Sequence, residues 1–143
     1  MKIVVGGVVE RDGKVLLVQE KKKRCYGKWN ISAGRLEPGE DIMRGAVREI
    51  KEETGCDVEL TGILSIDYRV MEDTPFIALI FSTRLVNEDI KFNKEELLDV
   101  KWYDIDEVIN RMDDKLRDSR FIKHSLINLK NGKVGALDII IDL

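Results

Sequence analysis

The chain has a single histidine, His124, among its 143 residues, and this scarcity excludes several kinds of catalytic site. A metal motif that needs two histidines cannot be built. A serine or cysteine nucleophile would have to recruit His124 from a carboxyl-terminal helical stretch, and no G-x-S-x-G motif accompanies it. Carboxylates are the abundant alternative for catalysis.

Cysteine is also scarce. Cys25 and Cys56 lie too far apart in sequence for a paired zinc motif, and two cysteines are too few for a disulfide framework. The apolar start, MKIVVGGVVE, is too short for a signal peptide, and no apolar run approaches the length of a membrane span. We therefore expect a cytoplasmic protein with reduced thiols and no membrane contact.

The chain lacks an excess of positive charge. Its 24 Lys and Arg residues face 27 Asp and Glu residues, which leaves a net charge of -3. A general nucleic-acid binder would be strongly basic, so no nucleic-acid polymer is expected as a partner. A small phosphate-bearing molecule would have to meet a local basic patch or a bound metal.

With only two prolines and no linker-like segment, the chain reads as a single domain spanning residues 1–143. Asp12-Gly13 between the apolar runs 2–10 and 15–18 predicts a β-hairpin. Further strands are expected at 29–31, 58–70, 75–86, 100–103 and 136–143, and helices at 41–54, 105–112 and 119–129. This mixture of strands with few helices predicts an α/β class.

The helix expected at 41–54 carries three acidic residues on one flank. Glu49 and Glu53 lie four residues apart, and Glu52 is a short arc away. Because like charges at these spacings repel, a cation is expected there. An oxygen-rich cluster without His or Cys suits a hard cation such as Mg²⁺ or Mn²⁺. The alternative is a solvated acidic face on which Glu52 pairs with Arg48.

Glycines near this flank favour a site. Gly45 inside a helix is unfavourable by about 1 kcal/mol relative to Ala, which suggests close approach by another backbone or a ligand. The segment 33–40 is rich in Gly and contains Pro, so we expect a loop that brings backbone carbonyls and Glu40 near the start of the helix. Loop and helix are expected to form one site.

Residues 34–56 read GRLEPGEDIMRGAVREIKEETGC, which resembles the Nudix box, G-x5-E-x7-R-E-U-x-E-E-x-G-U, where U is a bulky aliphatic residue. The matching positions are Gly34, Glu40, Arg48, Glu49, Ile50, Glu52, Glu53 and Gly55. Cys56 departs at the last aliphatic position, which concerns packing more than catalysis. The opening hairpin, the strand at 29–31 and the segment 102–107 also resemble the family, so the likeness covers most of the chain.

The resemblance implies the Nudix fold, a mixed β-sheet sandwiched between helices (α/β/α). It also implies a metal-dependent hydrolase that cleaves a phosphoanhydride bond of a nucleoside di- or triphosphate, or of a related small pyrophosphate, by attack of water on phosphorus. Glu49, Glu52 and Glu53 match the acids that bind the metal or activate water, and the carbonyl of Ala33 matches a position that often completes the metal shell. Arg48 would orient the glutamates. The glutamate that acts as the base varies within the family.

Outside the box, the expectations are coarser. A further catalytic acid is expected at Glu96, with Glu95 as its rival, and the alternative for either is a plain surface role. Candidate substrate contacts are Arg24, Tyr26, Lys28 and Arg35, and the alternative for the basic run at 22–28 is a solvated loop. Trp29 and Phe76 could stack on a base, but a core or strand-face position is favoured for both.

Several functions stay open. The carboxyl-terminal half resembles bacterial Nudix phosphatases that act on nucleoside tri- and diphosphates and thiamine-pathway pyrophosphates, and an ADP-ribose or oxidised-nucleotide pyrophosphatase is an alternative. An isoprenoid-pyrophosphate isomerase would be expected to have a degenerate box, which is not found. A nucleotide-sensing binding module is the non-enzyme alternative. The oligomeric state leaves no sign in the sequence.

Overall fold

The computed structural model describes all of residues 1–143, and its strands form two four-stranded sheets. The first sheet has the order β5-β1-β7-β6. It comprises β1 (Lys2–Val8), β5 (Ser32–Arg35), β6 (Asp57–Met71) and β7 (Thr74–Asn87). Strands β1 and β7 run parallel and the other pairs antiparallel, so this sheet is mixed.

The second sheet is antiparallel and is centred on β3, which pairs with β2, β4 and β8. It comprises β2 (Glu10–Arg11), β3 (Lys14–Glu20), β4 (Trp29–Asn30) and β8 (Leu97–Asp104). Asp12 and Gly13 join β2 to β3 and both have positive φ, 52° and 78°, as a tight hairpin turn requires. The predicted hairpin is confirmed.

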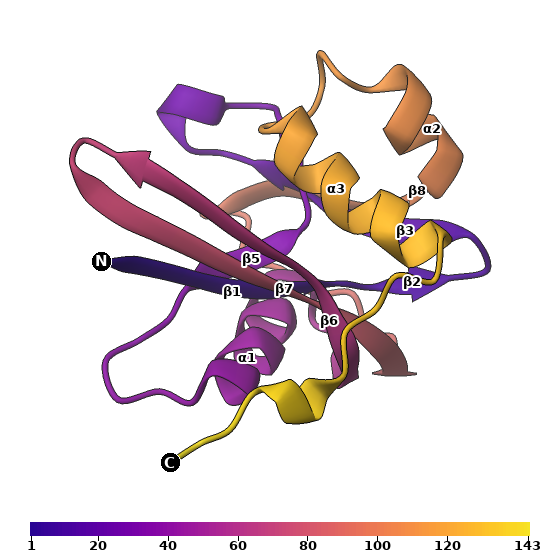
Figure 1. Ribbon diagram of the computed structural model, residues 1–143. Coiled ribbons are helices and arrows are strands. Elements are labelled where there is room, and N and C mark those ends of the chain that lie inside the picture. Colours follow the sequence, from indigo (N-terminus) through magenta and orange to yellow (C-terminus); the bar gives the residue numbers. More distant parts are fainter.

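Helices cover the sheets on two sides. Helix α1 (Ile42–Thr54) lies below the strands in Figure 1, and α2 (Ile105–Arg111) and α3 (Ser119–Lys130) lie above them. The core divides in the same way: Ile122 and Leu126 of α3 pack with Ile80 in one cluster, and Ala46 of α1 packs with Phe81 in another. The predicted α/β/α arrangement is confirmed. None of the helices is long and apolar enough to cross a membrane.

Capping interactions define both ends of α1, the helix that carries the acidic flank. The side chain of Asp41 accepts a hydrogen bond from the backbone N–H of Arg44 at 2.9 Å, which satisfies a free donor of the first turn. At the other end Gly55 has φ 81° and donates its N–H to the carbonyl of Lys51. The predicted C-cap is thus confirmed. Cys56, which departs from the box pattern, is fully buried beside Ile50.

The prediction that residues 33–40 form a loop is wrong at its start, because Ser32–Arg35 form strand β5. This strand pairs with β1 in a register that sets Gly6 opposite Ala33. A Cβ atom on Gly6 would overlap the carbonyl oxygen of Ser32, so the missing side chain permits this close pairing. The residue that permits β5 is therefore Gly6 of β1, about 27 residues earlier in the chain.

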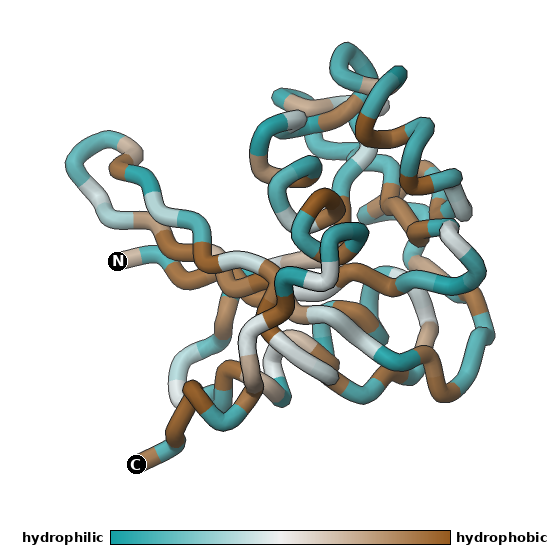
Figure 2. Tube along the Cα trace, turned by 45° about the vertical axis from the view of Figure 1, so that its right-hand side comes forward, coloured by the Kyte–Doolittle hydropathy of each residue, from teal (hydrophilic) through white to brown (hydrophobic).

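The predicted strand at 136–143 is also wrong. Beyond a two-way hydrogen-bonded bridge between Gly135 and Ile63, the chain forms the short 3-10 helix η2 (Leu137–Ile139) and leaves the body as the brown tail of Figure 2. Strand β6 has register shifts on either side of Ile63, which interrupt the edge that a further strand would need. Leu137 and Ile140 instead pack on the cluster that contains Ala46 of α1 and Phe81 of β7.

Candidate active site

Arg48 of α1 donates hydrogen bonds to three carboxylates. Its Nη1 donates to Glu49 Oε1 at 2.9 Å and to Glu52 Oε2 at 3.1 Å. Its Nε and Nη2 both donate to Glu40, the second at 2.8 Å. Nη2 also donates to the backbone carbonyl of Arg35 at 3.2 Å, which ties the helix to β5. Arg48 thereby fixes the positions of the box acids relative to the preceding strand.

These contacts have opposite effects on two neighbouring carboxyl groups. Hydrogen bonds from Arg48 lower the pKa of Glu40 to about 2, so this group remains an ionised anchor for the guanidinium. Burial raises the pKa of Glu49, although Arg48 opposes that shift. The Glu40 bond in turn raises the pKa of Arg48. Glu40 and Arg48 form a permanent ion pair, whereas Glu49 is held in a less favourable environment for its charge.

Glu53 forms no ion pair and faces the sheet. Its Oε1 accepts a hydrogen bond of 2.9 Å from the hydroxyl of Ser32 at the start of β5. Burial raises the pKa of Glu53 to about 8, and the negative charges of Glu49 and Glu20 add to this rise. A carboxyl group in such a place is a natural partner for a cation.

Two glycines within residues 34–56 admit the acidic side chains. A Cβ atom on Gly34 would overlap the carboxylate of Glu49, and a Cβ on Gly45 would lie 2.8 Å from Glu40 Oε1 and 2.8 Å from Leu36 Cδ1. Gly45 is closely approached, but by the side chains of Glu40 and Leu36, so the prediction of another backbone there is wrong.

The donor set fits a hard divalent cation in its chemistry, but the acids do not surround one point. All three side chains offer carboxylate oxygens, and Ala33 lies beside Ser32 at the same edge of the site. No group of three or more His, Cys, Asp or Glu side chains is arranged to hold a metal ion. Glu49 and Glu52 are hydrogen-bonded to Arg48, and the Glu52 contact is the pairing that the solvated-face alternative predicted. Glu53 is hydrogen-bonded to Ser32.

Sequence reasoning missed one buried acid, Glu20, at the end of β3. Only 5% of it is exposed, and its Oε1 accepts hydrogen bonds from Asn30 Nδ2 at 3.3 Å and Arg117 Nη1 at 3.2 Å. It is close enough to Glu53 to affect the pKa of that group. No two-residue periodicity marks it, because Val15 and Leu17 are buried as fully as Leu16 and Val18.

The acids predicted outside the box, Glu95 and Glu96, lie in the exposed turn before β8. Neither carboxylate makes an ion pair or a hydrogen bond to another side chain. Their catalytic role therefore stays a prediction.

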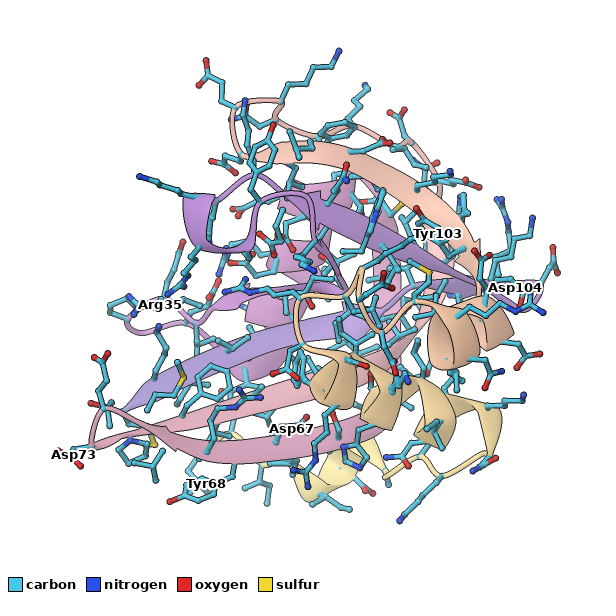
Figure 3. All side chains as sticks on the ribbon, turned by 90° about the horizontal axis from the view of Figure 1, so that it is seen from above. Arg35, Asp67, Tyr68, Asp73, Tyr103 and Asp104 are labelled. Carbon is cyan, nitrogen blue, oxygen red and sulfur yellow. The ribbon has the colours of Figure 1, made fainter.

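A cavity of about 660 Å³ opens beside the box acids, and Ala33 and Gly34 line it. Six basic residues surround it: Lys2, Lys22, Arg24, Arg35, Arg69 and Arg117. Figure 3 shows Arg35 at the same end of the molecule as the β6–β7 hairpin tip, marked by Asp73, with Tyr103 and Asp104 at the opposite end. Of the predicted substrate contacts, Arg24 and Arg35 line the cavity.

Tyr26 and Lys28 do not line this cavity. Tyr26 is 62% exposed, and the ammonium of Lys28 is bound to the backbone carbonyl of Asp114. Trp29 is buried, with its ring 5.0 Å from that of Tyr103 in an edge-on arrangement, which confirms its expected core position. Phe76 does line the cavity.

The cavity also has an unsatisfied polar atom. Asn30 is 8% exposed and lines the cavity, and its Oδ1 is a buried acceptor without a hydrogen-bond partner. Its Nδ2 is engaged by Glu20, which fixes the orientation of the amide. A buried acceptor left unpaired is unfavourable, so this amide carries a cost in free energy.

A family model described as the NUDIX domain matches residues 1–125, and the chain belongs to the Nudix family. The family prediction is thus confirmed. A solved structure of a NUDIX hydrolase from Nitrosomonas europaea superposes with a TM-score of 0.87 and 29% identity, covering 99% of this chain and 97% of that one. Nudix hydrolases generally depend on divalent metals.

Two curated relatives indicate the range of the family. The 8-oxo-dGDP phosphatase NUDT18 of Homo sapiens is 36% identical over 104 residues, which are 71% of this chain and 31% of that protein. The Xenopus laevis nucleoside diphosphate-linked moiety X motif 6 is 32% identical over 134 residues, or 90% of this chain and 61% of that protein. The chain spans only 25% to 31% of the lengths of the first four curated relatives it matches.

Proposed function

We propose that this chain is a Mg²⁺-dependent hydrolase that cleaves a phosphoanhydride bond of a nucleoside di- or triphosphate or a related small pyrophosphate. The observation that carries the proposal is the position of the box acids at the edge of a basic cavity. Gly34 lines the cavity and packs directly on Glu49, so a substrate that occupies the cavity would reach the acids. We infer that residues 1–143 work as one domain and that the free thiols belong to a cytoplasmic protein.

The proposed metal ligands are Glu49, Glu52, Glu53 and the carbonyl of Ala33. A bound divalent cation neutralises charge on phosphate oxygens and lowers the pKa of water. Arg48 holds Glu49 and Glu52 through charge-assisted hydrogen bonds, and metal binding would draw these carboxylates and that of Glu53 toward one point. One carboxylate accepts the proton of the attacking water.

A nucleotide is favoured over a simple pyrophosphate by the other wall of the cavity. Phe76 and Phe121 line it with apolar rings on which a base would stack. The name of the 8-oxo-dGDP phosphatase relative makes an oxidised nucleotide the second candidate substrate.

The test is phosphate or pyrophosphate release from nucleoside tri- and diphosphates, oxidised nucleotides and ADP-ribose, in Mg²⁺ and then in EDTA. We expect Mg²⁺-dependent turnover that Glu52→Gln and Glu53→Gln each reduce by about a hundredfold or more. Glu107→Gln, which removes an exposed acid of α2, is the matched control. Full activity in both box variants would refute the proposal, and nucleotide binding without turnover at saturating Mg²⁺ would favour a binding module instead.

A further inference from the structure

Four of the six cations at the cavity have no acidic partner. Lys2, Lys22, Arg24 and Arg35 come from β1, the start of η1 (Lys23–Cys25) and β5, and none of their side chains makes a hydrogen bond or an ion pair. Unpaired basic side chains are common on a surface. Four of them around one cavity are a specific arrangement that needs an explanation.

The other two cations of the cavity are neutralised within the chain. Arg69 pairs with Asp118, and Arg117 pairs with the buried Glu20. Asp118 is the only acidic residue that lines the cavity, so it does not offset the four free cations. Their mutual repulsion lowers the pKa of Lys2, with Arg35 as the largest cause. The cavity therefore has an excess of positive charge that a bound anion would balance.

Three of these cations make no bond to the box acids. The pyrophosphate to be cleaved belongs beside Glu49 and Glu53, and Arg35 directly follows Gly34, which packs on Glu49. Lys2 lies on β1 and Lys22 and Arg24 lie at η1, and their side chains make no ion pair or hydrogen bond with those acids. A phosphate monoester has a charge of about -2 at neutral pH, so Lys2, Lys22 and Arg24 have enough charge to balance one phosphate group in addition to the pyrophosphate beside Glu49. The charge exceeds what a neutral base or sugar at this end of a substrate would require.

We propose that this cavity binds a second phosphate-bearing group of the substrate, so that the preferred substrate is a small molecule phosphorylated elsewhere in addition to its hydrolysable pyrophosphate. The inference rests on the proposed function for the bond that is cleaved. The rival explanation is that the same cations only bind the cleaved pyrophosphate itself. The two differ in how strongly a remote phosphate improves binding.

The first experiment measures binding of inorganic tripolyphosphate by calorimetry in EDTA, where the box acids have no metal and cannot assist. We expect the Arg24→Ala/Arg35→Ala variant to bind at least about tenfold more weakly than the unmodified chain. The control is Arg44→Ala/Arg111→Ala, which removes the same charge from exposed positions away from the cavity. Equal weakening in both variants would mean that only net charge matters, and would overturn the proposal.

The second experiment compares ADP-ribose with its 2′-phosphorylated form under the same conditions, a pair that differs only by one remote phosphate. We expect the phosphorylated form to bind at least about fivefold more tightly, and Arg24→Ala/Arg35→Ala to remove this preference. Equal affinities for the unmodified chain would overturn the proposal. Because neither titration requires turnover, a protein that hydrolyses nothing would fail the proposed function while the cavity assignment is still decided.

Discussion

The carboxylate of Glu49 lies directly against the α-carbon of Gly34, with no room for a side chain between them. This contact places the first acid of the helix at the edge of β5 and of the basic cavity. Because the atoms that a Cβ would meet belong to the end of a flexible side chain, a substitution can be accommodated by moving Glu49. The glycine therefore controls where a carboxylate points more than whether the chain folds.

Gly34→Ala should separate activity from stability. We expect the free energy of unfolding to change by less than about 1 kcal/mol, since only a side-chain end is displaced. The turnover number should fall by about a hundredfold, because a shift of about 1 Å in a catalytic group has that effect. Gly135→Ala is the control, since its added methyl group would make only ordinary contacts at 3.5 Å and 3.6 Å. Unchanged turnover in Gly34→Ala would contradict this role.

Arg48→Lys should reduce turnover by about tenfold and Arg48→Ala by about a hundredfold. Lysine keeps the charge but cannot donate to Glu40, Glu49 and Glu52 from one planar group. Steady-state kinetics at saturating Mg²⁺ measure the effect, and Arg44→Ala, an exposed arginine of the same helix, is the control. If Arg48→Lys retains full turnover, the multiple hydrogen bonds are not needed.

Metal-free stability should depend on pH through Glu53. Its carboxyl group has a pKa of about 8 in the folded chain, against the ordinary value of 4.5. Between these values the folded state binds more protons than the unfolded state, so stability falls as the pH rises. Glu53→Gln has no proton to lose, and its stability relative to the unmodified chain should increase from about pH 5 to about pH 8.5. Denaturant unfolding in EDTA measures this, and parallel pH profiles would contradict it.

Glu20→Gln should lower the pKa of Glu53. The negative charge of Glu20 is one of the causes that raise it, and glutamine keeps the shape and the acceptor for Asn30. Carboxyl ¹³C chemical shifts followed through a pH titration in EDTA give the midpoint directly. A midpoint that stays the same or rises would show that Glu20 is electrically isolated from the site.

Local signals explain what the sequence predicted well. The bounds and caps of α1 follow from Asp41, Gly55 and the spacing of Ala46 and Ile50, all within one segment. The box motif placed Arg48 and the three glutamates on one flank for the same reason. The Asp12-Gly13 turn is equally local, since its two residues decide the conformation by themselves.

Contacts between distant segments explain what the sequence did not predict. Strand β5 exists because Gly6 admits it, and the terminal segment fails to form a strand because β6 is irregular around Ile63. The cavity draws Lys2, Arg24 and Arg35 from separate elements, and no periodicity within one segment links them. Burial of Glu20 likewise depends on Arg117, 97 residues away.

The parallel pairing of β1 with β7 determines when the protein can assemble during synthesis. Lys2 to Val8 pair in register with Phe76 to Ser82. Strand β1 therefore cannot form this pairing until more than half of the chain has left the ribosome. Helix α1 emerges before its sheet is complete. A nascent chain that ends before Ser82 contains the whole box motif but lacks the complete β1–β7 pairing on which α1 packs. Such fragments should be prone to proteolysis and aggregation.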